Sequence, residues 1–367
     1  MKVVCSFVGG AGHLIPQLPL LRALANAGHD LTLVGRESVT KSVPANLFNF
    51  IVSRSDRRSS VSSEVSPLVP LNVSAELTVV AHHFAGRAAR ESADAVSHVI
   101  AGADLLICDE LDFGAMAVAD RAGVPIVVVS VIASGSLVRD ELVNGSVREL
   151  REGYGVAGPP RLRGDLFIVP FAKSMRDPAF QPPAATLWMR PDLIGPPTPD
   201  GSIVVTLGTE FNSESGDLFN RILEAVGEVG APTVVAIGQD LDPAHFGTQP
   251  PNVRVERFVD LGELIPRAAV VLHHGGSGLF MSSVLGGAPQ IVFPMGADQP
   301  FTAQRINALG IGITLDAITT TPSEIQRTIE YTQSDRTFRS NVLAVRKEVI
   351  ELPTAESLIP ATIRLGQ

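Results

Sequence analysis

The glycine-rich run at residues 273–278 contains the residue types that point most directly to chemistry. It reads HHGGSG and joins an apolar run at residues 270–272 to a helix expected at residues 279–285. Glycines allow backbone N–H groups to approach an anion closely, and a helix N-terminus adds positive potential. We interpret this segment as a cradle for a diphosphate. A tight strand-to-helix turn without a ligand is the alternative.

A second candidate site pairs His13 with Asp109. His13 follows the glycine-rich turn at residues 9–12, at the head of an expected helix, and Asp109 follows an apolar strand at residues 104–108. Parallel strands end at the same edge of a sheet, so the two side chains can reach one cleft. A carboxylate behind a histidine makes the imidazole a competent general base near neutral pH. The structural alternatives are that His13 caps its helix and that Asp109, or its rival Asp112, caps the next one.

The turn before His13 does not fit a dinucleotide-binding fingerprint. Counted from Gly10, the motif G-x-G-x-x-G requires glycine at the position of Ile15. The second strand ends in Gly35-Arg36, where an NAD-binding enzyme needs an acidic residue. The pattern therefore does not indicate a nicotinamide cofactor.

The elements that must position these residues alternate between strand and helix in two separate stretches. In the first, strands are expected at 2–8, 30–34, 104–108 and 125–131, and helices at 14–27, 75–101 and 113–122. In the second, strands are expected at 202–207, 233–237, 252–255, 270–272 and 290–293, and helices at 217–229, 279–285 and 299–309. Residues 190–201, RPDLIGPPTPDG, cluster prolines and glycines as a linker does. This pattern predicts two doubly wound α/β domains with parallel sheets facing a central cleft.

Composition narrows the function classes. The chain has 367 residues, a formal net charge of −9 and no stretch rich in Lys or Arg, which argues against a nucleic-acid partner. Its two cysteines, Cys5 and Cys108, lie in apolar runs and are expected to be buried thiols in a reduced compartment. The apolar run at residues 124–133 is too short to span a bilayer, which takes about 20 residues. We expect a cytoplasmic protein with no stable membrane insertion.

Several motifs across both domains resemble one enzyme family. GAGHLIPQLPLLRALANAGHDLTLVG (residues 10–35) and ICDELDFGAMAVADRAGVP (residues 107–125) resemble N-terminal segments of glycosyltransferase family 1. This family includes bacterial antibiotic and macrolide glycosyltransferases and plant secondary-metabolite glycosyltransferases. VVTLGTEF and VERFVDLGELIPRAAVVLHHGGSG resemble its donor-binding segments. The resemblance implies the GT-B fold, with His13 as the catalytic base and Asp109 as its partner.

The resemblance also implies roles for residues of the second domain. The residues expected to bind the nucleotide-sugar donor are Gly208, Thr209, Phe258, Val259, His274, Gly276, Ser277, Gly278, Leu279, Asp298 and Gln299. Within this set His274 contacts the diphosphate, and Asp298 and Gln299 hold sugar hydroxyls. The chain departs from the family pattern at three positions: Leu279 replaces Thr or Ser, Phe258 replaces Trp, and Asp260 replaces Pro. His82, His83 and Phe84 are candidates for the acceptor pocket; an exposed helix face is the alternative for them.

The implied function is transfer of a hexose or deoxysugar, with inversion, from a dTDP- or UDP-sugar to a small hydrophobic acceptor such as a polyketide or aromatic aglycone. No permanently bound cofactor is expected and no metal is required. Residues 1–190 would bind the acceptor and 202–350 the donor, with 191–201 as linker and a helical tail at 351–367 packing back on the first domain. A homodimer is compatible with this assignment. The alternatives are a non-catalytic nucleotide-sugar-binding protein and an N-acetylglucosaminyltransferase acting on a membrane lipid.

Overall fold

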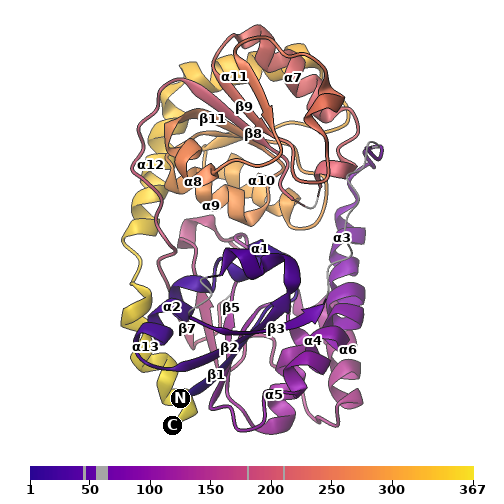
Figure 1. The fold of residues 1–367 in the computed structure, drawn as a ribbon, viewed down its shortest axis with the longest axis vertical. Helices are drawn as coiled ribbons and strands as arrows, with labels where there is room; N and C mark the ends of the chain where they lie inside the picture. Colours follow the sequence, from indigo (N-terminus) through magenta and orange to yellow (C-terminus); the bar gives the residue numbers. More distant parts are fainter. Residues whose placement is uncertain (44–46, 55–64, 180–181, 210) are drawn as a thin grey trace.

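Two parallel β-sheets organise the chain into two α/β domains (Figure 1). The computed structural model describes residues 1–43, 47–54, 65–179, 182–209 and 211–367. Helices cover the faces of both sheets, and the N-terminal domain lies below the C-terminal domain in the view of Figure 1. The prediction of two doubly wound parallel-sheet domains is confirmed.

The N-terminal sheet has the strand order β3-β2-β1-β4-β5-β6-β7. Its strands are β1 (Lys2–Ser6), β2 (Asp30–Arg36), β3 (Asn49–Arg54), β4 (Leu105–Asp109), β5 (Ile126–Val129), β6 (Leu166–Val169) and β7 (Thr186–Trp188). All neighbouring strands run parallel; Val4, for example, pairs with both Thr32 and Leu106. Strands β4, β5 and β6 are buried along their whole length, as expected for Val-, Ile- and Leu-rich strands covered by helices on both faces. The carboxyl ends of β1 and β4 therefore open on the same edge of the sheet.

The helices of this domain differ from the predicted ones in three places, the first being a helix at Asp140–Gly153, where none is predicted. They are α1 (Ala11–Leu14), α2 (Leu18–Asn26), α3 (Val73–Val79), η2 (Val80–Arg87), α4 (Ala88–Ser97), α5 (Phe113–Ala122) and α6 (Asp140–Gly153), with short turns η1 (Glu37–Ser42) and η3 (Lys173–Met175). The single helix expected at 14–27 is wrong, because Pro16 has no N–H to continue α1 and Pro19 starts α2 anew. The helix expected at 75–101 contains a π-helical stretch, η2, with non-helical dihedrals at Gly86.

The C-terminal sheet has the strand order β10-β9-β8-β11-β12-β13. Its strands are β8 (Ser202–Thr206), β9 (Thr233–Ala236), β10 (Val253–Glu256), β11 (Ala268–His273), β12 (Gln290–Val292) and β13 (Gly312–Thr314). Its helices are α7 (Leu218–Val229), α8 (Leu261–Leu264), α9 (Ser277–Leu285), α10 (Gln299–Ala308), α11 (Pro322–Ser334) and α12 (Arg336–Ile350), with short turns η4 (Asn212–Glu214), η5 (Pro243–Phe246) and η6 (Ile265–Arg267). Helix α9 directly follows β11, so its N-terminus faces the edge where the strands end.

The two domains are joined by more than the segment between β7 and β8. One hydrophobic cluster includes Phe113 and Phe171 from the first domain together with Phe280 and Phe301 from the second. Helix α12 runs down the side of the molecule and leads into α13 (Ala355–Ile363) and η7 (Arg364–Gly366), and α13 packs on α2 (Figure 1). The last helix of the chain therefore lies on the N-terminal domain.

Two further sequence features can be compared with the structure. Cys5 and Cys108 are fully buried free thiols, as predicted, and burial raises the pKa of both. Among the described residues, no helix is both long enough and apolar enough to cross a bilayer.

Candidate active site

His13 and Asp109 meet at the edge of the N-terminal sheet. Nδ1 of His13 lies 3.2 Å from Oδ2 of Asp109, whose carboxylate is completely buried. Two backbone groups hold that carboxylate in place: Val8 N donates to Oδ2 (2.9 Å) and Leu111 N donates to Oδ1 (2.7 Å). Gly9 lets the chain pass this close, because a Cβ there would lie 2.0 Å from the His13 ring. The predicted juxtaposition of base and carboxylate is thus present, with the carboxylate pre-oriented by the backbone.

The alternative in which Asp109 caps the next helix does not hold. Asp112 is the N-cap of α5, and its side chain accepts hydrogen bonds from Ala115 N and from the Ser92 hydroxyl. Burial, with Asp109 nearby, raises the pKa of Asp112 to about 6. Asp109 is therefore left to face His13.

Carboxylates from both domains influence the pKa of His13. Burial by itself lowers the pKa of His13, but Asp109, with smaller contributions from Asp298 and Glu110, outweighs burial and raises it. Asp298 belongs to the C-terminal domain, so the charge of a predicted donor-sugar residue acts on the predicted base from the other domain. The imidazolium formed when His13 accepts a proton is stabilised at this position.

Phe84 borders His13 on the side of the π-helical stretch η2. Its ring stacks on the His13 ring with centroids 5.9 Å apart and an interplanar angle of 28°. His83 contacts Phe84 edge-on at 5.0 Å, while both His82 and His83 are exposed. Of the three residues predicted to line an acceptor pocket, Phe84 is the one in contact with the candidate base.

The segment predicted to cradle a diphosphate leads from β11 into α9. Gly275 adopts a positive φ of 95°, and Gly276 is the N-cap of α9, so the first N–H groups of this helix have no acceptor within the helix. The His274 ring lies between two glycines: a Cβ at Gly208 would approach it to 2.6 Å and one at Gly276 to 2.5 Å. Phe211 stacks on the other side of His274 at 6.0 Å. Two close backbone approaches and one aromatic ring thus fix the orientation of this imidazole.

The two histidines of this segment have different surroundings. Gly275 N donates to Nδ1 of His273, so Nε2 carries the proton and donates to Oε1 of Gln290. Burial lowers the pKa of His273 to about 4 and that of His274 to about 3. Within the described part of the chain, Nδ1 of His274 is buried without a hydrogen-bond partner. His273 is satisfied by the protein, whereas His274 retains unused hydrogen-bonding capacity.

Ser277, Asp298 and Gln299 form a hydrogen-bonded group beside the cradle. The Ser277 hydroxyl donates to Oδ2 of Asp298 and accepts from Ala133 N of the other domain at 2.8 Å. Burial raises the pKa of Asp298, and the bond from Ser277 partly opposes this shift. Oε1 of Gln299 accepts from Met295 N at 2.7 Å and from Gly296 N at 3.2 Å. The side chain of Asp298 is thus oriented by Ser277, and that of Gln299 by its own loop.

The remaining predicted donor residues lie on loops or at the start of α9. Thr209 is exposed and follows Gly208, which has a φ of 81°. Phe258 is 72% exposed, Val259 is half-buried, and Gly278 and Leu279 lie in the first turn of α9. Asp260, at the position where the family commonly has Pro, caps α8 by accepting from Gly262 N and Glu263 N. The exposed ring of Phe258 is available to a ligand.

Sequence reasoning missed three residues of this region. Phe211 stacks on His274, Ala133 bonds to Ser277, and Oε2 of Glu76 accepts a hydrogen bond from Ala297 N at 2.7 Å. Phe211 stands in the quoted motif VVTLGTEF, where its spacing from Gly208 was an available signal. Ala133 and Glu76 act across the domain interface, and no sequence pattern marks them.

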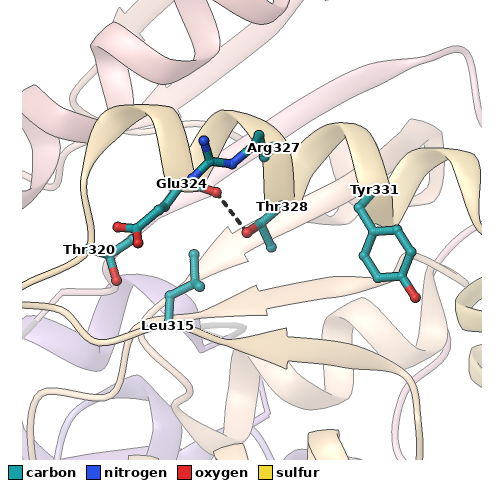
Figure 2. A pocket seen from close by; sticks show the side chains of 6 residues that line it. All are labelled: Leu315, Thr320, Glu324, Arg327, Thr328 and Tyr331. Atoms are coloured by element: carbon teal, nitrogen blue, oxygen red, sulfur yellow. Dashed lines mark hydrogen bonds between the residues drawn. The ribbon is translucent and has the colours of Figure 1, made fainter.

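A shallow pocket on the C-terminal domain lies apart from these residues (Figure 2). It has a volume of about 360 Å³ and is lined by Leu315, Thr320, Glu324, Arg327, Thr328 and Tyr331. The one bond between residues drawn there joins the Thr328 hydroxyl to the Glu324 carbonyl and belongs to helix α11 itself. None of the predicted site residues lines this pocket.

No metal centre is evident among the described residues, where His, Cys, Asp and Glu nowhere gather in threes that could hold an ion. The expectation that the reaction requires no metal stays a prediction.

Comparison with known proteins is consistent with this geometry. Residues 220–365 match the model of the erythromycin biosynthesis protein CIII-like C-terminal domain. The L-demethylnoviosyl transferase of Streptomyces niveus is 29% identical over 100% of this chain and 97% of its own. The 3-alpha-mycarosylerythronolide B desosaminyl transferase of Saccharopolyspora erythraea is 29% identical over 160 residues, which is 43% of this chain and 38% of the relative.

Solved structures share the fold over almost the whole chain. The calicheamicin glycosyltransferase CalG4 superposes with a TM-score of 0.79 at 24% identity, covering 99% of this chain and 98% of its own. The glycosyltransferase VinC, solved in complex with dTDP, superposes with a TM-score of 0.76 at 20% identity. The match covers 100% of this chain and 99% of VinC. The chain is therefore a nucleotide-sugar-dependent glycosyltransferase with the GT-B fold, and over its whole length it is similar to antibiotic glycosyltransferases.

Proposed function

We propose that this enzyme transfers a hexose or deoxysugar, with inversion, from a dTDP-sugar to a hydroxyl group of a small hydrophobic natural product, with His13 as general base. The observation that carries the proposal is the placement of His13 beside Asp109, where the charge of Asp298 from the other domain also raises its pKa. The full-length relative from Streptomyces niveus is named as a sugar transferase, and VinC binds dTDP, which supports a thymidine nucleotide over UDP.

In the proposed reaction the acceptor oxygen attacks the anomeric carbon of the donor sugar. As the new C–O bond forms, His13 removes the acceptor proton through Nε2, the ring nitrogen not directed at Asp109. The bond between the anomeric carbon and the diphosphate oxygen breaks in the same step. Asp109 stabilises the imidazolium, and the single displacement inverts the anomeric configuration.

The departing diphosphate is proposed to lie on the cradle between β11 and α9. The N–H groups at the start of α9 and the partial positive charge of this helix end face the developing negative charge. Burial lowers the pKa of His274 to about 3, so its imidazole is neutral and can offer one ring N–H to a phosphate oxygen. A dianionic ligand beside it would raise that pKa and strengthen the bond.

The proposed acceptor site lies on the other side of His13, against Phe84. A ring stacked on the base provides an apolar, planar surface beside the position of the reacting hydroxyl. This favours an aromatic or polyketide aglycone over a phospholipid carrier, so the N-acetylglucosaminyltransferase alternative has less support. A non-catalytic binding role would leave the orientation of His13 by Asp109 unexplained.

The test is a transfer assay with dTDP-sugars and a panel of phenolic and polyketide acceptors. We expect a product whose anomeric proton coupling shows the configuration opposite to that of the donor. His13→Ala should reduce transfer by at least about 10²-fold and leave dTDP binding intact, because His13 lies outside the cradle. Transfer with retention, or full activity in His13→Ala, would contradict the proposal. Binding of dTDP without transfer to any acceptor would favour the non-catalytic alternative.

A further inference from the structure

The N-terminal domain reaches across to the C-terminal domain through residues 65–76, here called the strap. Ser66 N donates to Ser213 O at 2.8 Å, and Gly216 N donates to Ser66 O at 3.0 Å. Leu68 packs on Gly216 and on the core of the C-terminal domain. The strap then enters α3, which stands at the right-hand edge of the molecule between the two domains (Figure 1). A segment of the acceptor domain is thereby fastened beside the donor site.

Glu76, in the first turn of α3, is the point where the strap meets the loop at residues 295–299. Its Oε2 accepts the hydrogen bond from Ala297 N at 2.7 Å. Gly296 lies directly beneath it: a Cβ there would meet both carboxylate oxygens of Glu76 at 3.4 Å and the Phe211 ring at 3.2 Å. This carboxylate is therefore packed against the loop that contains Asp298 and Gln299.

The backbone that Glu76 holds is strained. Ala297 has a φ of 52°, and in the described part of the chain it is the one residue other than glycine with a positive φ. An L-amino acid resists this conformation because its Cβ crowds the backbone. A charged acceptor on the N–H of the same residue offsets that cost. Since Asp298 is the next residue, the dihedrals of Ala297 determine where its carboxylate points.

A second contact from the acceptor domain ends on the same carboxylate. Ala133 N donates to the Ser277 hydroxyl, and that hydroxyl donates to Asp298. Asp298 is thus positioned from two sides by the N-terminal domain, through Ala133 and through Glu76. Among the described residues, no hydrogen bond of this kind joins Glu76 to cradle residues 275–278.

We infer that Glu76 is a positioning residue for the donor sugar. It holds Ala297 in its strained conformation and so keeps Asp298 and Gln299 directed at the sugar hydroxyls, a role that rests on the proposed function. Removing Glu76 should weaken the contribution of the sugar to donor binding and leave the nucleoside diphosphate contribution unchanged. Donor-sugar recognition would then require the two domains to be in contact.

The experiment measures dissociation constants for dTDP and for dTDP-glucose by calorimetry. The ratio of the two constants isolates the contribution of the sugar. In Glu76→Ala we expect the affinity for dTDP-glucose to fall about tenfold, the size expected for loss of one charge-assisted hydrogen bond, with dTDP unchanged. Glu76→Gln should keep most of the affinity, because its amide oxygen can still accept from Ala297 N. Glu149→Ala removes an exposed carboxylate from α6 and serves as the matched control.

A rescue variant separates positioning from direct contact with the sugar. Glycine adopts positive φ without strain, so Ala297→Gly placed in the Glu76→Ala protein should recover part of the lost affinity for dTDP-glucose. The inference would be overturned if Ala297→Gly restored no affinity for dTDP-glucose or if Glu76→Ala weakened binding of dTDP and dTDP-glucose equally. It would also be overturned if the wild-type protein bound the two ligands with the same dissociation constant. Wild-type protein that binds neither ligand would overturn the proposed donor site as well. Wild-type binding of both ligands with Glu76→Ala unaffected would overturn the inference alone.

Discussion

Replacing Asp109 with asparagine should slow transfer, because it removes the charge that stabilises protonated His13. The substitution removes the negative charge 3.2 Å from Nδ1 of His13 and keeps the side-chain volume. It also disturbs the carboxylate's backbone bonds, because Val8 N and Leu111 N each donate to a different oxygen. An amide has one acceptor oxygen, so one of these N–H groups will face an NH₂ group, at a cost of about 1–3 kcal/mol in stability.

The effect on the rate follows from the charge that His13 gains in the transition state. Two unit charges 3.2 Å apart attract by about 5 kcal/mol at an effective dielectric constant of about 20. The net value of a hydrogen bond to a charged group is smaller, about 1.5–3 kcal/mol. At about 1.4 kcal/mol per tenfold change, these bounds correspond to a fall in kcat of between about 10- and 10⁴-fold. We expect about 10²–10³-fold for Asp109→Asn.

The pH dependence provides a sharper test than the rate. A general base must be neutral, so activity falls when the pH drops through the pKa of His13. Burial lowers this pKa, but Asp109 outweighs burial and holds it above the ordinary value of 6.5. In Asp109→Asn the buried imidazole loses its main charged partner. The acid limb of the kcat profile should therefore move to lower pH while the plateau falls.

The assay is transfer from a dTDP-sugar followed from about pH 5 to 9, with calorimetric binding of dTDP as a check on folding. Asp109 lies in the N-terminal domain, so dTDP affinity should be close to that of the wild type. An acid limb that stays in place or moves to higher pH would refute the assignment of Asp109 as the partner of the base. Full activity at the plateau would refute it equally.

Three further outcomes are expected. Gly208→Ala places a Cβ at a position with positive φ and against the His274 ring. The variant should therefore unfold at a lower temperature, and calorimetry should show dTDP binding weakened at least about tenfold. Burial lowers the pKa of His273 to about 4, so the unfolded chain binds this proton at higher pH than the folded one, and the contribution of His273 to stability should fall by about 2 kcal/mol from pH 6.5 to pH 5. Urea unfolding at the two pH values should show a smaller loss in His273→Asn; an equal loss would contradict this account. Phe84→Ala removes the ring stacked on the base. The KM for an aromatic acceptor should therefore rise by about tenfold while the KM for the donor stays unchanged. A change in the donor KM alone would place Phe84 outside the acceptor site.

Elements with local start and stop signals were predictable from sequence. Helix α5 has the predicted bounds, residues 113–122, because Asp112 caps its start and Gly123, with a φ of 70°, ends it. The contact between His13 and Asp109 was also predictable, since each residue follows a strand of the same parallel sheet. The leucine spacing over residues 14–27 predicts one continuous helix, but Pro16 and Pro19 break it into α1 and α2.

Features that depend on tertiary packing could not be read from the sequence. The π-helical stretch that turns Phe84 toward His13 leaves a residue pattern close to that of an ordinary helix. Glu76 and Ala133 bond to the donor loop and cradle because of how the two domains dock, and their neighbours in sequence carry no motif. The positive φ of Ala297 has no sequence signal either, since alanine is not a residue that favours it.

The most direct test of the donor site is calorimetric titration of the wild-type protein with dTDP and UDP, repeated on His274→Ala. The account predicts dTDP binding with a dissociation constant on the order of micromolar, weakened at least about tenfold when the imidazole is removed. A folded protein that binds neither nucleotide, or that binds dTDP equally well without His274, would contradict the assignment of the cradle between β11 and α9 as the donor site.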